Sequence, residues 1–209
     1  MKTTRNITLA IFISILLFSC KEAVKNSNSP VVEITVNQPA TKKKKDNTRK
    51  IAKVNIKATV NGEDFSLTTY NPEKSTDVIY QNNAVQFRIT DFSGQSVLVN
   101  LQSPDMFSQK PFTIRQQTAA LPIQEVHGTK EQSKLSFDFK SEDPAIPIIY
   151  EMYDGELVVE KFSDTKIVIT FNGRGFRWGI NNKEANLFPI DGSIVIENFS
   201  INDFRITEE

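Results

Sequence analysis

Residues 53–70, KVNIKATVNGEDFSLTTY, decide the fold class of this chain. Apolar and polar residues alternate along the first half, as in a β-strand with one buried face. The apolar set is Val54, Ile56, Ala58 and Val60. Asn61-Gly62 follows, and Asn-Gly between two alternating runs is the strongest short signal of a β-hairpin. Phe65 and Leu67 then resume the alternation, so the stretch predicts two antiparallel strands.

The same period of two recurs through residues 51–209. The further alternating runs are Val85, Phe87, Ile89; Val97, Val99, Leu101; Leu135, Phe137, Phe139; Leu157, Val159; Ile167, Ile169, Phe171; Ile194, Ile196; and Phe204, Ile206. Turns are expected at Gly94, Gly128, Asp154-Gly155, Gly173 and Asp191-Gly192. No helix of normal length stands out in this region. We predict an all-β domain, an antiparallel β-sandwich or barrel of about 8–10 strands.

The N-terminus has the pattern of an export signal. Lys2 and Arg5 precede the apolar run ITLAIFISILLFS, residues 7–19. A run of this length is too short to span a bilayer, which takes about 20 residues. We therefore expect residues 1–19 to be a signal peptide that is removed.

Cys20, the only cysteine, follows this run directly. With Leu17 and Ser19 before it, the junction resembles the bacterial lipobox, which implies that the thiol is lipidated and that Cys20 becomes the mature N-terminus. Two or more acyl chains hold a protein stably at a membrane. A secreted protein with an unpaired cysteine and a weakly hydrophobic N-terminal anchor are the alternatives. A single cysteine forms no disulfide within the chain and leaves the folded part without a thiol catalyst.

Residues 20–50 are expected to form a flexible polar tether. Asn, Ser, Thr, Pro and Lys dominate, and such a composition buries too little apolar surface to offset the cost of ordering the backbone. VVEITV, residues 31–36, alternates like a strand that could add to a sheet edge. Lys42–Lys45, with Arg49 and Lys50, are read first as a solvated linker and alternatively as a contact for anionic lipid headgroups or lipopolysaccharide.

Two short patterns at the ends of the domain carry a family resemblance. They are I-x-A-x-V-N-G-x-x-F at residues 56–65 and I-x-G-S-I-V-I-x-N-x-x-I at residues 190–201. Together with the lipobox and the spacer, they resemble small uncharacterised lipoproteins of Bacteroidota. The resemblance implies an antiparallel β domain without an assigned activity, exported and lipid-anchored to the bacterial envelope at the outer membrane. Lys21-Glu22 matches the acidic surface-export mark of such proteins only in part, so the periplasmic or surface face stays open.

The residues favour no catalytic, metal or cofactor site. His127 is the only histidine, too few for a zinc site or a recognisable Ser-His-Asp triad. Glu142, Asp143 and Asp154 flank PAIPIIYEMY, and Glu151 lies within it; a glycosidase pair or a calcium site built from these four is an alternative to ordinary solvated loops. The chain has 25 basic and 25 acidic residues, and loss of Lys2 and Arg5 leaves 23 against 25, so the net charge favours no partner. No nucleic-acid partner is expected, because an exported protein meets little nucleic acid and no aromatic residues interleave the lysines at 42–45.

The stretch NGRGFRWG, residues 172–179, combines the residue types found at binding hot spots: Arg174, Phe176, Arg177 and Trp178. The favoured interpretation is a strand with both aromatic rings in the core and both arginines in solvent. The alternative is a binding site in which Trp178 stacks on a sugar and an arginine holds an anion.

Two classes of function remain from the sequence. The first is a non-catalytic binding or scaffold module at the envelope, joined to the membrane through Cys20, with a glycan, a lipid or an envelope protein as partner. The second is a hydrolase whose site the sequence does not locate. A lipocalin-like carrier, with an apolar ligand inside a barrel, is a further alternative.

Overall fold

The computed structural model describes residues 50–108, 110–118, 130–143 and 145–206. They form eleven strands and one 3₁₀ turn, η2. The strands are β1 (Lys53–Val60), β2 (Glu63–Leu67), β3 (Val78–Gln81), β4 (Ala84–Thr90), β5 (Ser96–Gln102), β6 (Phe112–Ile114), β7 (Gln132–Phe139), β8 (Ile148–Ser163), β9 (Lys166–Arg177), β10 (Phe188–Glu197) and β11 (Ile201–Asp203); η2 is Lys183–Asn186. The predicted signal peptide, Cys20, residues 21–49 of the tether with VVEITV, His127 and Gly128 lie outside the described residues.

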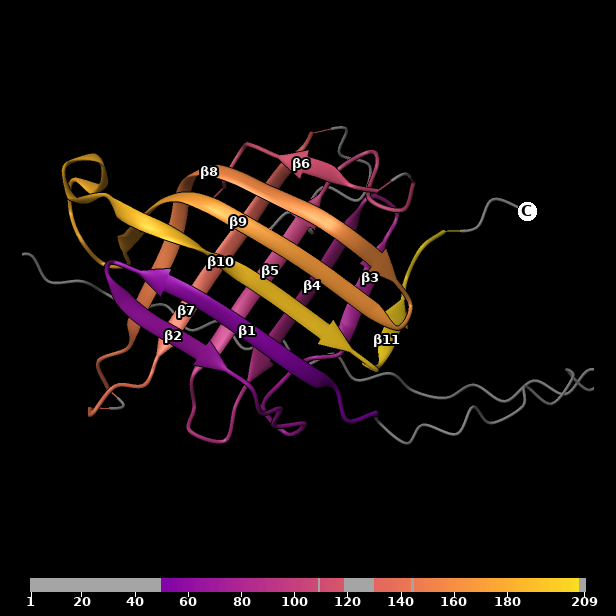
Figure 1. The fold of residues 1–209 in the computed structure, drawn as a ribbon, viewed down its shortest axis with the longest axis horizontal. Helices are drawn as coiled ribbons and strands as arrows, with labels where there is room; N and C mark the ends of the chain where they lie inside the picture. The colour runs from indigo at the N-terminus through magenta and orange to yellow at the C-terminus, as the bar shows by residue number, and fades with distance from the viewer. Residues whose placement is uncertain (1–49, 109, 119–129, 144, 207–209) are drawn as a thin grey trace, which may run out of the picture. The chain divides into compact units, whose positions relative to one another are not determined.

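All eleven strands belong to one mixed sheet, which folds over on itself into two layers (Figure 1). The order is β11-β3-β4-β5-β7-β8-β9-β10-β1-β2, with β6 paired to β8. Every pairing is antiparallel except that of β11 with β3. The sheet is not closed, so the sandwich-like form of the predicted all-β fold is confirmed and the barrel form is wrong. The predicted runs miss β3, β6 and β11, which have three or four residues each and are too short to show an alternating pattern. The predicted run at Phe204 and Ile206 is wrong, since both residues lie beyond β11 and are exposed.

The hairpin of β1 and β2 forms as the sequence predicts. Asn61 and Gly62 both have positive φ, 54° and 78°, which suits the type I′ turns that match strand twist. Val60 pairs with Glu63 across this turn. The predicted inward residues from Ile56 to Leu67 are buried, and the hairpin therefore contributes one face to the core.

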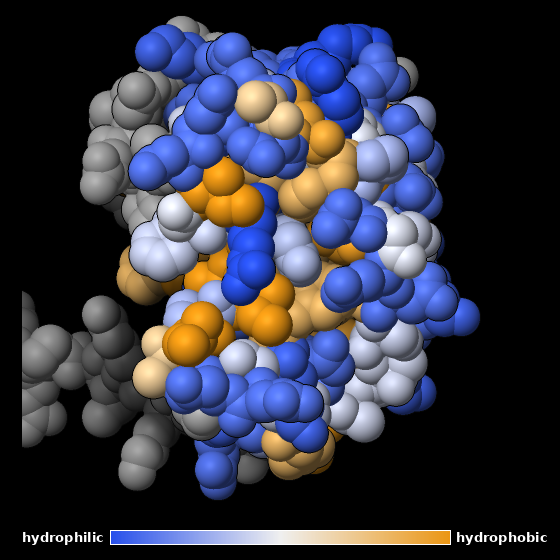
Figure 2. Space-filling view, turned by 90° about the vertical axis from the view of Figure 1, so that its left-hand side faces the viewer, coloured by the Kyte–Doolittle hydropathy of each residue, from blue (hydrophilic) through white to orange (hydrophobic). Residues whose placement is uncertain are grey.

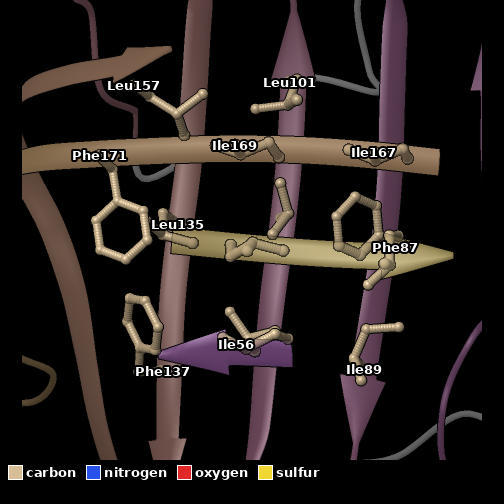
Figure 3. Packing of buried hydrophobic residues seen from close by; sticks show 14 of the residues in the cluster. Ile56, Phe87, Ile89, Leu101, Leu135, Phe137, Leu157, Ile167, Ile169 and Phe171 are labelled. Atoms are coloured by element: carbon tan, nitrogen blue, oxygen red, sulfur yellow. The ribbon is translucent and has the colours of Figure 1, made fainter. Parts of the chain in front are cut away.

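The core fills the space between the layers. Figure 3 shows side chains from β1, β8 and β9 meeting side chains from β4, β5 and β7, whose strands run across them. Ile56, Phe87 and Phe137 are fully inaccessible to solvent. Each such side chain stabilises the fold by about 1.5–3 kcal/mol through removal of apolar surface from water. The interior is therefore closely packed by the protein's own side chains.

Three of the glycines expected in turns lie inside long strands instead. Gly155 is in β8, Gly173 in β9 and Gly192 in β10, so the predicted turns there are wrong. A Cβ on Gly173 would lie 2.0 Å from the carbonyl oxygen of Asp154, and one on Gly192 would lie 2.8 Å from Cζ of Phe171. Glycine is needed at these positions because a neighbouring backbone or the ring of Phe171 leaves no room for a Cβ. The chain does not reverse direction there.

β8 connects the two layers. Its first four residues pair with β7, and Leu157 to Val159 pair with β6 on one side and β9 on the other. Irregular registers at Met152–Asp154 and Val159–Lys161 allow the strand to bend. Among the described residues, no helix is both long and apolar enough to cross a membrane.

Candidate functional site

The site candidate lies where β9 ends. Trp178 follows the last strand residue, Arg177, and its amide donates a 2.8 Å hydrogen bond to the carbonyl of Ile149. The chain then turns at Gly179, whose φ of +84° suits glycine. Because the strand stops at this point, the predicted core position of Trp178 is wrong, and the residue is 58% exposed.

Apolar side chains from the loop before β8 stand beside this tryptophan. Ile146 is 57% exposed and Ile180 is 37% exposed. Together with Ala145, Pro147, Arg177, Trp178 and Gly179, they line an open depression of about 350 Å³, here called the Trp178 patch. Figure 2, which views the end of the sandwich where β9 finishes, shows apolar residues gathered there among polar ones. Contiguous exposed apolar surface of this kind marks interaction sites more often than scattered residues do.

Arg177 is the charged group of the patch. The other arginines of the described ranges are engaged: Arg88 with Ser96, Arg115 with Glu156, Arg174 with Asp154 and Arg205 with Asp203. Arg177 is the one arginine in residues 50–206, apart from the gaps in the description, whose side chain makes neither a hydrogen bond nor an ion pair. Its guanidinium is therefore free to meet an anion or a carbonyl group.

Arg174 is in β9 itself, not in a tight turn. Its Nε donates a 3.1 Å hydrogen bond to Oδ1 of Asp154, and its Nη2 pairs with Oδ2 of the same carboxylate. This hydrogen bonding raises the pKa of Arg174. The glycines on either side serve the close approach of β8, since a Cβ on Gly175 would lie 2.8 Å from the carbonyl oxygen of Glu151. Arg174 is therefore committed to the partner strand and does not line the Trp178 patch.

Phe176 is buried, but outside the main core. It pairs in register with Glu151, which alternates with the core residues Tyr150 and Met152 and so faces the other side of the sheet. The ring of Tyr153 packs edge-on against it, and the ammonium of Lys183, on η2, lies 4.2 Å from its centroid. Phe176 thus holds η2 against β9 and steadies the segment that carries Ile180.

The candidate carboxylates do not converge on one site. Nζ of Lys134 lies 3.1 Å from Oε1 of the buried Glu151, and Asp154 is paired with Arg174. Asp143 shapes the loop of the patch: its carboxylate accepts the amide of Ala145, and its carbonyl accepts the amide of Ile146, both at 2.9 Å. Nowhere in the described ranges do three or more His, Cys, Asp or Glu side chains gather as a metal site would require.

The opposite end of the sandwich is closed by aromatic rings. Tyr80, Phe107 and Phe162 pack against one another with centroids 5.3–5.6 Å apart. The guanidinium of Arg205 covers Phe107 at 4.6 Å from its centroid, and the ammonium of Lys110 lies 5.7 Å from that of Phe162. The two ends of the sandwich therefore differ in character.

Sequence reasoning found Arg177 and Trp178 but missed Ile146 and Ile180. The available signal was the apolar segment AIPII between Pro144 and Tyr150, in which Pro147 argues against a strand interior. Neither models of protein families, nor curated proteins, nor solved structures gave any match to this chain.

Proposed function

We propose that the protein is a non-catalytic binding module of the bacterial envelope and that the Trp178 patch is its contact surface. The observation that carries the proposal is an exposed Trp178 beside two exposed isoleucines and an unpaired Arg177. Tryptophan and arginine are the residue types that dominate binding energy at protein interfaces. A rim of charged side chains with an apolar centre is the usual form of such an interface.

The composition of the patch favours a protein partner over a glycan. Arg177 and the indole N–H of Trp178 are its only side-chain hydrogen-bonding groups, whereas a sugar presents many hydroxyl groups that need hydrogen-bonding partners. Three aliphatic side chains and a proline instead complement an apolar protein surface. A glycan and a lipid remain outcomes that the test below distinguishes.

The interior supports a module over a carrier or a hydrolase. An apolar ligand inside the sandwich would have to displace side chains such as Leu101, Leu135 and Ile169, which are completely buried against one another (Figure 3). A glycosidase would need two carboxylates that converge on one bond, and Glu151 and Asp154 are instead held in separate ion pairs with Lys134 and Arg174. The proposal therefore assigns the chain a surface role.

Anchoring through a lipidated Cys20 is part of the proposal. The lone cysteine directly after a short apolar run and Ser19 supports it. Metabolic labelling with palmitate should mark the wild-type protein and not Cys20→Ala. Equal labelling of both proteins would contradict the anchor without bearing on the patch.

Site-specific photocrosslinking tests the patch. A photoreactive phenylalanine analogue replaces Trp178 in the full chain, and Phe92 is the control position because it is an aromatic residue 70% exposed elsewhere on the surface. We expect a discrete protein adduct from position 178 that is absent from position 92. Arg177→Ala, combined with the analogue at 178, should reduce the yield of that adduct.

The nature of the adduct decides between the partner classes. A protein band of fixed mass supports the proposal. A mass increase of the size of a glycan or a lipid would show that the partner is not a protein, although the Trp178 patch would still be the binding surface. The same adducts from both positions, or none from position 178, would refute the patch as a binding site.

A further inference from the structure

A group of lysines occupies the end of the sandwich opposite to the Trp178 patch. Lys53 on β1 and Lys166 on β9 flank Glu197 on β10 in cross-strand register. With Lys161, Thr165 and Asn198, they line an open depression of about 370 Å³, here called the lysine end. In Figure 1 this is the right-hand end, where the arrow of β10 finishes.

The lysine end carries an excess of positive charge. Its three ammonium groups face a single carboxylate, which leaves 3 − 1 = +2 on the lining side chains. Nζ of Lys166 lies 2.6 Å from Oε1 of Glu197 and engages that carboxylate. This hydrogen bond lowers the pKa of Glu197, and the nearby charges of Lys53 and Lys161 lower it further. Lys53 and Lys161 therefore remain available to an external anion.

The chain enters the domain at this end. The amide of Lys50 donates a 2.9 Å hydrogen bond to Oγ of Ser200, and Nδ2 of Asn198 donates to the carbonyl of Ile51 at 3.2 Å. Ile51, two residues before Lys53, is 68% exposed. Lys166 and Arg177 are the first and last of the 12 residues of β9, and they lie about 36 Å apart at about 3.3 Å per residue.

We propose that the lysine end is a docking surface for the anionic phosphate headgroups of a membrane, so that the domain rests on the bilayer with the Trp178 patch facing away. Each lysine near an anionic membrane surface increases the ratio of membrane-bound to free protein about fivefold. The exposed Ile51 favours a membrane surface over a free anion as the ligand, because an apolar side chain can enter the membrane interface and gains nothing from a free anion. The entry of the preceding chain at the same end permits this orientation for any anchor that lies N-terminal to residue 50.

Differential lysine labelling of the full chain in vesicles tests the orientation. An uncharged amine-reactive reagent is applied to protein in phosphatidylcholine vesicles with and without phosphatidylglycerol, and modification is read by mass spectrometry. We expect labelling of Lys53, Lys161 and Lys166 to fall at least about fivefold when phosphatidylglycerol is present, and to recover at high salt. Lys140, exposed beyond β7 at the Trp178 end, is the internal control and should not change.

Matched variants distinguish this surface from general charge effects. In Lys53→Gln/Lys161→Gln, protection of Lys166 should disappear, whereas Lys57→Gln/Lys140→Gln should retain it with the same loss of charge. Circular dichroism confirms that both variants are folded. Equal labelling with and without phosphatidylglycerol, or an equal fall at Lys140, would overturn the proposal. Protection by inorganic phosphate in phosphatidylcholine vesicles would also overturn it and would assign the lysines to a free anion.

Discussion

The amide of Trp178 donates a hydrogen bond to the carbonyl of Ile149, so the pairing of β8 with β9 continues one residue beyond the strand. The backbone of Trp178 is therefore fixed while its side chain stays exposed. A side chain on an ordered backbone loses less conformational entropy on binding than one on a mobile loop. The Trp178 patch is accordingly preorganised for contact.

The fluorescence of Trp178 should report an accessible side chain. It is the only tryptophan, and with more than half of its surface exposed, its emission should be that of an indole in water. Acrylamide should quench it in the folded protein nearly as well as in the unfolded one. Blue-shifted emission that resists quenching would contradict the exposed position. Trp178→Ala should change the free energy of unfolding by no more than about 0.5 kcal/mol.

Arg174→Ala should have little effect on stability or on partner binding. Its side chain and that of Asp154 are 59% and 38% exposed, and an ion pair this accessible contributes about 0–1 kcal/mol. Thermal denaturation measures the first expectation, and the crosslink yield from position 178 measures the second. A large loss of crosslinking with Arg174→Ala, but not with Arg177→Ala, would move the site from the patch to β9.

Tyr80→Phe should alter the stability of the protein at high pH. Burial is the main reason why the pKa of Tyr80 is raised, and the nearby negative charge of Asp164 adds to the shift. Among the described residues, no group forms a hydrogen bond of normal geometry with the Tyr80 hydroxyl. Since the folded-state pKa exceeds the unfolded value, stability from the neutral hydroxyl is complete below about pH 10 and is lost as the pH rises above it.

Chemical denaturation across the alkaline range provides the measurement. The variant should be as stable as the wild type at pH 7, or about 1 kcal/mol more stable, because a buried hydroxyl without a partner is removed. It should then lose less stability than the wild type above pH 10. Parallel pH profiles of the two proteins would show that Tyr80 does not cause the alkaline loss.

Gly173→Ala should destabilise the sandwich by about 2–3 kcal/mol, because its Cβ would collide with the backbone of Asp154 and no side-chain movement can relieve the contact. Gly94→Ala is the control, because an added Cβ there would have no atom within 4 Å. Its φ of +97° strains an alanine backbone, so the free energy of unfolding should fall by only about 1–2 kcal/mol. Urea denaturation compares them. Equal losses would indicate that β8 and β9 separate readily at this point.

A chain of residues 50–209 should fold by itself into a β-rich domain. Its core draws on strands between Lys53 and Glu197, and the buried residues come from both layers. Far-UV circular dichroism should give a β-sheet spectrum with cooperative thermal unfolding. A random-coil spectrum would show that residues before Lys50 are required for folding.

The sequence predicted the fold class where alternation was regular, as in β1, β4 and β9, because the period of two directly reflects one buried face. It failed at Gly155, Gly173 and Gly192, since glycine serves both turns and close backbone approach, and only tertiary contacts distinguish these uses. The parallel pairing of β11 with β3 could not be predicted from the sequence either, because a local residue pattern does not indicate which distant strand lies beside it.

The site was predictable only in part. Arg177 and Trp178 were recognised by residue type, but the orientation of Trp178 depended on where β9 stops. Ile146 joins them because β7 and β8 bring their connecting loop to the end of β9, a contact between segments more than thirty residues apart. Such a surface becomes visible only once the strands are in register.

The common register of β1, β10 and β9 also determines how the domain would bear mechanical load. The chain enters β1 at one end of these strands, and Trp178 lies at the other. Tension between Lys50 and Trp178 would run along the strand axes and pass through eight residue pairs between β1 and β10 and ten between β10 and β9. The hydrogen bonds between these paired strands would be loaded in shear and would resist together, instead of opening one after another. A partner pulling on Trp178 would thus meet a domain that yields only when whole strands slide.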